Sequence, residues 1–436
     1  MKLRSSFFYR LNNNEVFRYI DEDKKSIHIV NKESDVIENQ LFDKFKFVDT
    51  KASNFFPDSE KFDLIVITDL IEFVDNIFDL LITSKKHLND NGRIVITSIN
   101  PRWYFIIKIN EFFNLKKSSS IKSYIYPKKI KGTIEAGGLE ILNSYNKQII
   151  PFNFLGIGKL LNIFLEVLLC PFGLGLKTYF VCRPKINKEK VYTKSLIVPA
   201  KNEEKNLPIL FEELEKLEMN LEIILIYANS EDNTEIASYQ IEEKYKKHKN
   251  LDVTVYKQTQ NGKANAVFEA LEYTNNDVIA IIDSDISVEP FELKNFYKII
   301  DLGNADFVNG SRLISGLESG SMRFLNILGN RFFQFIINLI ISQNISDSLC
   351  GTKVFKKENI NFLKKWQKKT YQSDPFGDFD LLMSAAYSGQ KIVEYPIYYR
   401  SRIYGKTQIS RFRDGFKLLK YIVRTFFLFK TSYYSK

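Results

Sequence analysis

Short apolar runs alternate with charged amphipathic stretches throughout the second half of this 436-residue chain. Four of the runs are typical of buried strands: KSLIVP, LEIILIYA, LDVTVYK and DVIAIID. The stretches between them, such as 203–218 and 234–247, have the spacing of amphipathic helices. Strands that alternate with helices predict an α/β fold with a parallel sheet covered by helices. Polar residues at the carboxyl ends of these strands are therefore the candidates for function.

The first half shows a weaker form of the same pattern. Phe62–Thr68 and Arg93–Ile99 are predicted strands, Leu70–Leu88 is a predicted helix, and Asn91-Gly92 supplies a turn. This half is also expected to be an α/β domain.

A polar stretch, RPKINKEKVYTK at 183–194, separates the two halves. We expect an N-terminal domain over residues 1–185, a linker over 186–194 and a C-terminal domain over 195–410. A basic segment, 411–436, follows the second domain.

Composition narrows the class of protein. Hydrophobic residues make up 44% of the chain and charged residues 26%, which excludes a mainly disordered protein. The three cysteines, Cys170, Cys182 and Cys350, are too scattered for a zinc site or a disulfide framework and favour a reducing, cytosolic setting. The net charge of +10 predicts an anionic partner. No nucleic-acid-binding motif accompanies that charge, so we do not expect nucleic acid to be the partner.

No stretch reads as a clean membrane span. Leu160–Leu176 and Phe324–Ile341 are the most apolar segments, but polar residues interrupt both, which favours buried or interface-lying helices. The 391–436 region contains eleven Lys and Arg residues against two acids. This region contains a predicted helix with two distinct faces. The apolar face comprises Phe412, Phe416, Leu419, Val423 and Phe426. The basic face comprises Arg411, Lys417, Lys420 and Arg424. This pattern is typical of a helix lying on an anionic membrane, although a helix packed on its own domain would show it too.

The sharpest chemical signal is Asp283-Ser284-Asp285, directly after the apolar run DVIAII. Two carboxylates at a strand end can bind a hard divalent cation, which in turn can bridge a diphosphate. A solvated turn would explain the same residues without a metal. Polar loops after two other strands, 200–202 and 229–234, and the helix start at Gly262-Lys263 are predicted to lie beside the pair.

Eight ordered blocks then give a resemblance over about residues 192–425. VPAKNEE, NSEDNT, NGKANA and IIDSDIS resemble family 2 glycosyltransferases with the GT-A nucleotide-sugar fold. VNGSRL, DSLCGTKVF, GDFDLL and RSRIYGKT resemble the dolichyl- and polyprenyl-phosphate mannosyltransferase-like branch. The resemblance implies Mg²⁺ or Mn²⁺ on Asp283 and Asp285, a catalytic base at Asp378, and a phosphate-facing Arg402, with Arg400 as the alternative. The nucleotide-sugar site would comprise Pro199, Ala200, Asn202, Glu203, Asn229, Lys263, Asp283 and Arg312.

Three positions depart from the family pattern. Tyr227-Ala228-Asn229 stands where an acidic residue often contacts the base, Ser287 stands where the branch often has Gln, and Thr407-Gln408 replaces a common Ser-Lys. These changes leave the donor nucleotide, the sugar and the acceptor open.

Three blocks in residues 60–183 resemble class I S-adenosylmethionine methyltransferases: FDLIVITDLIEFVDN, LNDNGRIVITSINPRWY and IEAGGLEIL. The glycine-rich cofactor loop, expected after a first strand near Ser26–Val30, is missing, since residues 26–40 read SIHIVNKESDVIENQ and contain no glycine. We therefore expect a degenerate, Rossmann-like domain. Asp69 and Glu72 are its remaining site candidates, and helix capping would also explain them.

The sequence thus predicts an inverting, metal-dependent glycosyltransferase, cytoplasmic and peripherally bound to the membrane. It would transfer sugar from a nucleotide-sugar donor to a polyprenyl-phosphate or glycan acceptor. Two alternatives stay open: a bifunctional glycosyltransferase and methyltransferase in surface-glycan synthesis, and a non-catalytic scaffold.

Overall fold

A computed structural model of the chain divides into two compact units, residues 1–185 with 429–436 and residues 186–428. The structure describes residues 10–20, 24–31, 42–48, 56, 60–105, 127–151, 153, 156–186, 189–314, 324–370, 374–402, 404 and 411–431.

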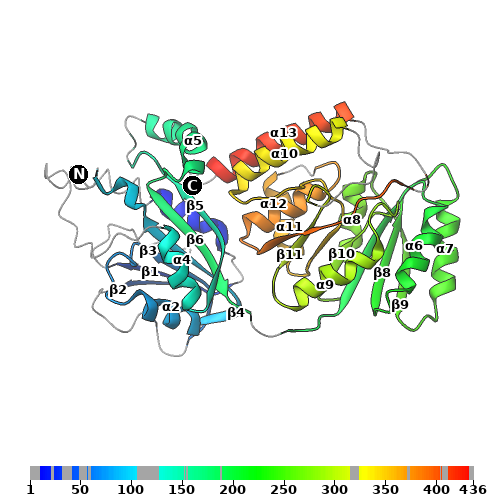
Figure 1. Cartoon of the computed structure of the whole chain (residues 1–436), viewed down its shortest axis with the longest axis horizontal. Helices are drawn as coiled ribbons and strands as arrows, with labels where there is room; N and C mark the ends of the chain where they lie inside the picture. Colours follow the sequence, from blue (N-terminus) through cyan, green and yellow to red (C-terminus); the bar gives the residue numbers. More distant parts are fainter. Residues whose placement is uncertain are drawn as a thin grey trace. The chain divides into compact units, whose positions relative to one another are not determined.

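The first unit is built on a six-stranded sheet of order β2-β1-β3-β4-β6-β5 (Figure 1). Four of the strands are parallel, and β6 runs antiparallel to both of its neighbours, β4 and β5. The strands are β1 (Ser26–Asn31), β2 (Lys44–Val48), β3 (Phe62–Thr68), β4 (Leu88–Ile99), β5 (Leu139–Lys147) and β6 (Lys177–Pro184). The helices are α2 (Ile77–Lys86), α4 (Pro127–Ala136) and α5 (Ile157–Leu169), with short 3₁₀ helices η1 (Phe17–Tyr19), η2 (Pro101–Trp103) and η3 (Cys170–Phe172).

Two predictions in this unit were wrong in their boundaries. The helix predicted from residue 70 begins only at Ile77, because the Asn76 side chain caps it by accepting a hydrogen bond from the Asp79 amide. Asn91-Gly92 lies inside β4 rather than in a turn, since β4 begins at Leu88 and pairs with Phe62.

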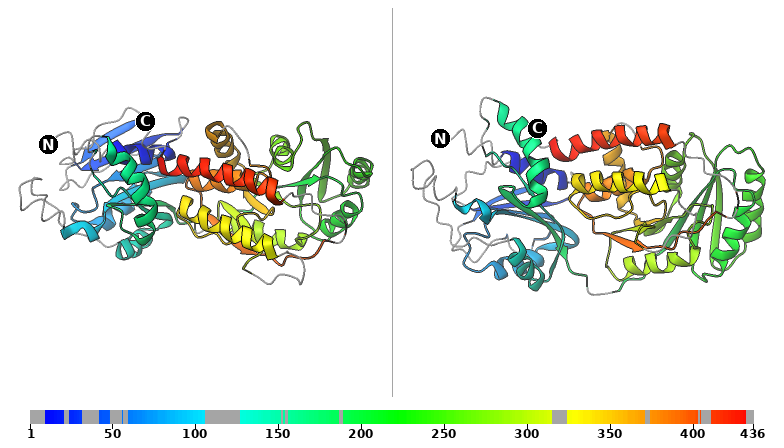
Figure 2. Two further views of the ribbon diagram at one scale, coloured as in Figure 1. Left: turned by 90° about the horizontal axis from the view of Figure 1, so that it is seen from above. Right: turned by 45° about the horizontal axis from the view of Figure 1, so that its top comes forward.

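The second unit contains a seven-stranded sheet of order β13-β11-β12-β10-β7-β8-β9, flanked by helices (Figures 1 and 2). Its strands are β7 (Lys194–Ala200), β8 (Leu221–Tyr227), β9 (Leu251–Lys257), β10 (Val278–Ile281), β11 (Phe307–Ser311), β12 (Lys353–Lys356) and β13 (Ile392–Pro396). Its helices are α6 (Asn206–Glu215), α7 (Thr234–Tyr245), α8 (Lys263–Tyr273), α9 (Leu293–Asp301), α10 (Phe324–Ile341), α11 (Asn359–Thr370), α12 (Asp378–Tyr387) and α13 (Arg411–Thr431), with η4 (Pro290–Glu292).

The prediction of a wholly parallel sheet was wrong for one strand. β12 runs antiparallel to β10 and β11, so the sheet is mixed. The helix predicted to start near Glu203 begins at Asn206, which leaves 201–205 as a loop at the carboxyl end of β7. The α/β class itself is confirmed for both units.

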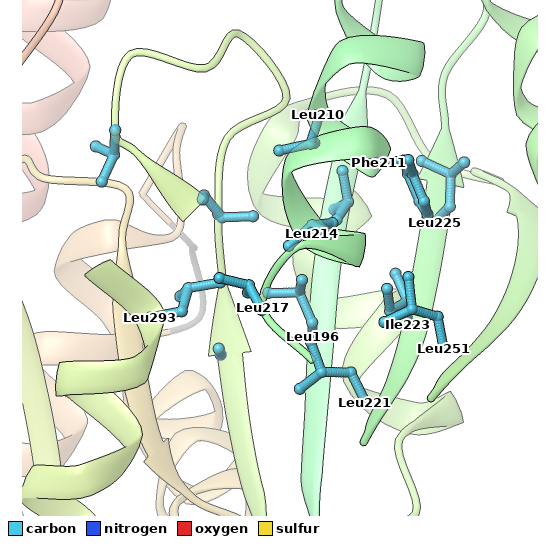
Figure 3. Close-up of a cluster of buried hydrophobic side chains, with 14 of the residues drawn as sticks. Leu196, Leu210, Phe211, Leu214, Leu217, Leu221, Ile223, Leu225, Leu251 and Leu293 are labelled. Atoms are coloured by element: carbon cyan, nitrogen blue, oxygen red, sulfur yellow. The ribbon is translucent and has the colours of Figure 1, made fainter. Parts of the chain in front are cut away.

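Leucine side chains from α6 pack onto the strands of the second sheet (Figure 3). Leu210, Phe211 and Leu214 of α6 are fully buried, as are Leu196 of β7 and Leu225 of β8. Each such side chain contributes about 1.5–3 kcal/mol relative to an exposed one. This packing holds the carboxyl ends of β7, β8 and β10 in a fixed order, and the polar loops that follow them converge there.

Helix α13 combines both arrangements that the sequence left open. One face packs on its own unit through Leu418, Tyr421 and Ile422. The predicted apolar face lies largely outside, because Phe416 and Val423 are exposed and Phe426 is half-buried. The side chains of Arg411 and Phe412 lie outside the described residues. None of the described helices combines the length and apolar character that a bilayer crossing needs.

Candidate active site

The two predicted metal-binding carboxylates directly follow β10, which is a central strand of the second sheet. The loop that carries them is anchored by Ser284, whose hydroxyl donates to the Pro199 carbonyl at 3.0 Å. Ile286 then adopts a left-handed backbone conformation with φ of 55°, which is costly for a β-branched residue. The loop between β10 and η4 is therefore held in one strained shape beside the end of β7.

Lys263, the first residue of α8, lies against Asp283 with its Nζ 2.5 Å from Oδ1. Burial alone would raise the pKa of Asp283, but the Lys263 ammonium and the guanidinium groups of Arg402 and Arg312 bring it below its ordinary value. Gly351 lies directly beside this pair, and a Cβ at that position would overlap the Asp283 carboxylate. The charged carboxylate thus packs directly against the Gly351 backbone, in space that a side chain at that position would occupy.

Asp285 is held from two directions. Its Oδ1 accepts from the amide and hydroxyl of Ser287, at 3.0 and 2.6 Å, and its Oδ2 lies 2.9 Å from Nε of Arg402. Arg402 therefore lies beside the carboxylate pair. Arg400 instead pairs with Glu289.

Asp378 opens α12 and faces two lysines. Nζ of the fully buried Lys353 lies 3.7 Å from Asp378 Oδ1, and Lys263 is close enough to act on its charge. Burial raises the pKa of Asp378 above its ordinary value, although both lysines oppose that shift. Asp378 does not cap α12, because Gly377 holds the N-cap position. The Asp374 carboxylate accepts from the amides of Phe376, Gly377 and Asp380 at 2.8–2.9 Å.

Arg312 is engaged within the protein. It forms a two-pronged pair with Asp347, with Nε and Nη2 lying 2.6 and 2.8 Å from the carboxylate oxygens. Asp347 is fully buried, and its pKa falls to about 2 because the Arg312 pairing outweighs the opposing effect of burial. Arg312 therefore contributes positive charge near Asp283, but in this structure its guanidinium fork is used by Asp347.

The predicted nucleotide loops at the ends of β7 and β8 are tied together. The Asn202 amide donates to Ser230 Oγ at 3.1 Å, and Asn202 Oδ1 accepts from the Glu231 amide at 2.7 Å. Asn202 has a φ of 56°, and its side chain is half-buried. Pro199 is half-buried, Ala200 is buried in β7, and Asn229 is exposed. These residues line one sheet edge.

Glu203 belongs to the same edge, and its amide donates to Thr234 Oγ1 at 2.8 Å. Burial, with Asp285 and Asp283 nearby, raises the pKa of Glu203 to about 7, although Asn206 and Arg402 act against the shift. Glu203 can therefore change its charge near neutral pH, and a cation bound nearby would favour its ionised form.

The donor set fits a hard divalent cation. Carboxylate oxygens are the ligands that Mg²⁺ and Mn²⁺ prefer, and Asp283 and Asp285 present them after the same strand. Over the described residues, no cluster of three or more His, Cys, Asp or Glu side chains could hold a metal by itself. A cation at Asp283 and Asp285 would therefore need further oxygen ligands from a substrate, as a diphosphate would supply.

Sequence reasoning missed three residues of this site: Lys353, Gly351 and Asp374. Lys353 donates to Asn309 Oδ1 at 3.0 Å, and this contact keeps its ammonium in the interior. Gly351 and Lys353 lie inside the block DSLCGTKVF, whose position in the sequence could have marked them. Asp374 is separated from GDFDLL by only two residues, and its role depends on the turn between them.

In the first unit, Asp69 and Glu72 are both buried. Nζ of the fully buried Lys177 lies 2.9 Å from Asp69 Oδ1. Glu72 Oε1 accepts from the Ile99 amide at 2.6 Å, and burial together with Asp69 raises the pKa of Glu72 to about 7. Helix capping does not explain them, since α2 begins at Ile77. Residues 32–41, where the cofactor loop was expected, lie outside the described residues.

Three comparisons relate the chain to known proteins. Residues 195–363 match the model of glycosyl transferase family 2. The chain is 25% identical over 238 residues to the low-salt glycan biosynthesis hexosyltransferase Agl6 of Haloferax volcanii, covering 53% of either protein. It is 25% identical over 240 residues to the dolichol-phosphate mannosyltransferase of Pyrococcus furiosus, covering 52% of this chain and 64% of the relative. The chain thus spans less than two thirds of either relative.

A solved structure is similar to about half of the chain. Glucosyl-3-phosphoglycerate synthase from Mycobacterium tuberculosis, in complex with Mn²⁺, UDP-glucose and phosphoglyceric acid, superposes with a TM-score of 0.41 and 16% identity. The overlap covers 53% of this chain and 80% of that one. The similarity to family 2 rests on the sequence match and not on this superposition. The match at residues 195–363 includes the strand-end carboxylates and Lys263, so the second unit contains a region similar to family 2 glycosyltransferases, and a hexosyltransferase is among the chain's homologues.

Proposed function

We propose that this chain transfers a sugar from a nucleotide-sugar donor to a polyprenyl-phosphate or glycan acceptor, with inversion at the anomeric carbon. The observation that carries the proposal is the charged cluster after β10. Asp283 and Asp285 lie there beside Lys263 and Arg402, within the segment that matches family 2. The GT-A fold of this unit is part of the proposal.

When the cluster binds a nucleoside diphosphate, its charged side chains would exchange their present ion-pair partners for the ligand and the metal. Lys263 and Arg402 neutralise the two carboxylates in the structure described here. Mg²⁺ or Mn²⁺, when bound at Asp283 and Asp285, would neutralise the negative charge of the leaving diphosphate. Lys263 and Arg402 could then turn to the phosphate oxygens, which an ammonium binds as a point charge and a guanidinium can bind with two parallel hydrogen bonds. The loops at Asn202 and Asn229 would hold the nucleoside.

Asp378 would serve as base for a sugar hydroxyl. Its raised pKa favours proton uptake, and the adjacent Lys353 stabilises the carboxylate before the proton arrives. A lipid phosphate is already an anion and would need no base. An Asp378→Asn variant that retains transfer to a lipid phosphate but loses transfer to a glycan would distinguish the two acceptors.

Two helices of the second unit would provide a membrane-facing surface. We define it by the exposed apolar side chains of α10 and α13: Leu328, Phe332, Phe335, Phe416, Leu419, Val423 and Phe427. Both helices pack on α12, since the Phe379 ring contacts Phe333 of α10 and Tyr421 of α13. The exposed Lys417 and Lys420 lie beside this surface and suit anionic lipid head groups.

The donor proposal is tested with the metal and the nucleotide. Asp285→Ala should abolish Mn²⁺-dependent binding of UDP- or GDP-sugars in calorimetric titration, while thermal unfolding stays close to wild type. Glu289→Ala, a nearby acid in no contact with the pair, is the control. Unchanged metal-dependent affinity in Asp285→Ala would exclude the metal role. Donor binding without hydrolysis or transfer to any acceptor would favour the scaffold alternative.

The membrane proposal is tested separately. Lys417→Glu, Lys420→Glu and Arg424→Glu together should release the chain from anionic vesicles, and salt should do the same to wild type. Hydrolysis of soluble donor should be unaffected. Wild-type protein that stays in the supernatant at low salt would contradict a membrane acceptor site on this surface.

We further propose that the first unit is a methyltransferase-like module without methyltransferase activity. Support comes from the parallel core of its sheet with the antiparallel strand β6, and from the buried Asp69–Lys177 pair at its strand ends. A lysine in that place neutralises the carboxylate that would otherwise be available to a ligand. No observation favours the bifunctional alternative.

A further inference from the structure

Helix α5 has its polar side chains inside and its apolar side chains outside. Gly158, Asn162 and Glu166, spaced four residues apart, form its buried row. The most exposed side chains of α5 are large and apolar: Ile157 (49% exposed), Leu160 (68%), Leu161 (42%), Phe164 (64%) and Leu168 (48%). Phe172 of the adjoining η3 is 73% exposed. A surface helix normally has the opposite arrangement.

Hydrogen bonds fix this orientation. Asn162 Oδ1 accepts from the amides of Ile149 and Ile150 at 2.9 and 2.7 Å, and its Nδ2 donates to the Ile150 carbonyl at 2.8 Å. Glu166 Oε1 accepts from the Gln148 amide at 2.8 Å. These bonds satisfy the backbone that follows β5. Rotating α5 to hide its apolar side would leave buried amides without partners, which is strongly unfavourable.

The chemistry of the outward side points to lipid as its covering. The exposed side chains of α5 gather on the face opposite the buried polar row, and all of them are apolar. Glu166 is the only acid of α5, and it is buried, so no carboxylate on the helix opposes an anionic surface. Lys159 adds positive charge at the first turn. With 13 residues, α5 is about 20 Å long, too short to cross a bilayer.

We propose that α5 and η3 insert into the boundary between head groups and acyl chains of a membrane, as a lipid-binding element of the first unit. This element goes beyond the function proposed above, since it belongs to the first unit and contains none of the residues proposed for sugar transfer. Because its outward side is almost uncharged, its contribution to membrane binding should persist at high salt and on zwitterionic lipid.

The test uses the full chain and phosphatidylcholine vesicles at high salt, conditions that weaken the basic surface of α13. Leu160→Asp with Phe164→Asp should lower vesicle affinity at least about tenfold, because two large side chains would no longer be buried in hydrocarbon. Ile236→Asp with Tyr239→Asp, exposed positions on α7, is the matched control and should change nothing. Equal affinity of both double variants would overturn the proposal.

A second measurement reports insertion directly. Phe164→Trp should show a blue-shifted emission and quenching by brominated lipid, while Ile236→Trp should show neither. Absence of quenching at position 164 would overturn the proposal. So would a dimer of wild-type chain in solution that Leu160→Asp dissociates without any effect on vesicles. Hydrolysis of soluble donor, measured on the same variants, should match wild type, so failure here is distinct from failure of the glycosyltransferase proposal.

Discussion

Gly351 controls the shape of the charged cluster more directly than any acidic residue does. Its backbone lies against both Asp283 and Lys263, and any side chain there would push the pair apart. The glycine is needed for space and not for its backbone angles, because its φ is outside the left-handed region that only glycine favours.

Gly351→Ala should therefore lower kcat/KM for sugar transfer by about a hundredfold, the usual cost of misplacing reacting groups by about 1 Å. The free energy of unfolding should fall by only about 1–3 kcal/mol, as for other overpacked sites. Gly132→Ala, in the interior of α4 with nothing near its new methyl group, is the control and should keep full activity. Steady-state kinetics and chemical denaturation measure both effects, and wild-type activity in Gly351→Ala would show that the site tolerates the added group.

Glu72 makes the stability of the first unit depend on pH. Its carboxyl has a pKa of about 7 in the folded chain, against an ordinary value of 4.5, because of burial and then of Asp69. The folded state thus keeps a proton that the unfolded state releases between those values. The free energy of unfolding should fall as pH rises from about 4.5 to about 7, by up to about 3 kcal/mol.

Glu72→Gln should flatten this dependence while keeping the oxygen that accepts from Ile99. Chemical denaturation at pH 5 and pH 8, followed by Trp103 fluorescence, provides the comparison. Exposed Glu135→Gln should retain the wild-type slope. A slope in Glu72→Gln as steep as wild type would assign the dependence to another group.

At the scale of elements, α13 holds the start of α12 through one side chain. Tyr421 donates to Asp380 Oδ1 at 2.6 Å, and Trp366 of α11 donates to the same oxygen at 3.0 Å. The amides of Asp380 and Asp374 each donate to the other residue's carboxylate, at 2.9 and 3.1 Å. The turn that presents Asp378 is therefore fixed by contacts from α11 and α13.

Tyr421→Phe should reduce kcat for transfer while leaving the KM for donor unchanged, because Asp378 would lose its fixed position but Asp283 and Lys263 would not. Stability should fall by about 2 kcal/mol, the typical value for a hydrogen bond to a charged group. Tyr273→Phe, which removes the hydroxyl of an exposed residue of α8 and keeps the ring that stacks on Tyr256, is the control. A Tyr421→Phe variant with reduced stability and full kcat would limit Tyr421 to a structural role.

At the scale of the whole molecule, the chain joins two α/β units that differ at their strand ends. The second unit places carboxylates beside cations that are partly exposed, such as Lys263 and Arg402. The first unit places Asp69 against a lysine that is fully buried. Only the second arrangement leaves charge that a ligand in solution can reach.

The full chain should accordingly gain thermal stability from UDP or GDP with Mn²⁺ and none from S-adenosylmethionine. A ligand present at a hundred times its Kd stabilises the folded state by about 2.7 kcal/mol, which a thermal shift resolves readily. A chelator should remove the nucleotide effect. A shift with micromolar S-adenosylmethionine would restore the bifunctional hypothesis.

The sequence by itself determined the α/β class, the strand cores and the position of the carboxylate pair, because these depend on local periodicity. β3 and α10 match the predicted residues at both ends. The order of the sequence blocks also predicted which family would match, because the motifs of that family are short and contiguous in sequence.

Only the tertiary structure decided the antiparallel direction of β12, the pairing of Arg312 with Asp347, and the inverted faces of α5. Each depends on partners distant in sequence: β12 on β10 and β11, Arg312 on a residue 35 positions away, and α5 on the backbone amides after β5. Periodicity states which side of a helix is apolar. It cannot state which side the protein buries, because buried amides that need acceptors can outweigh the gain from hiding apolar surface.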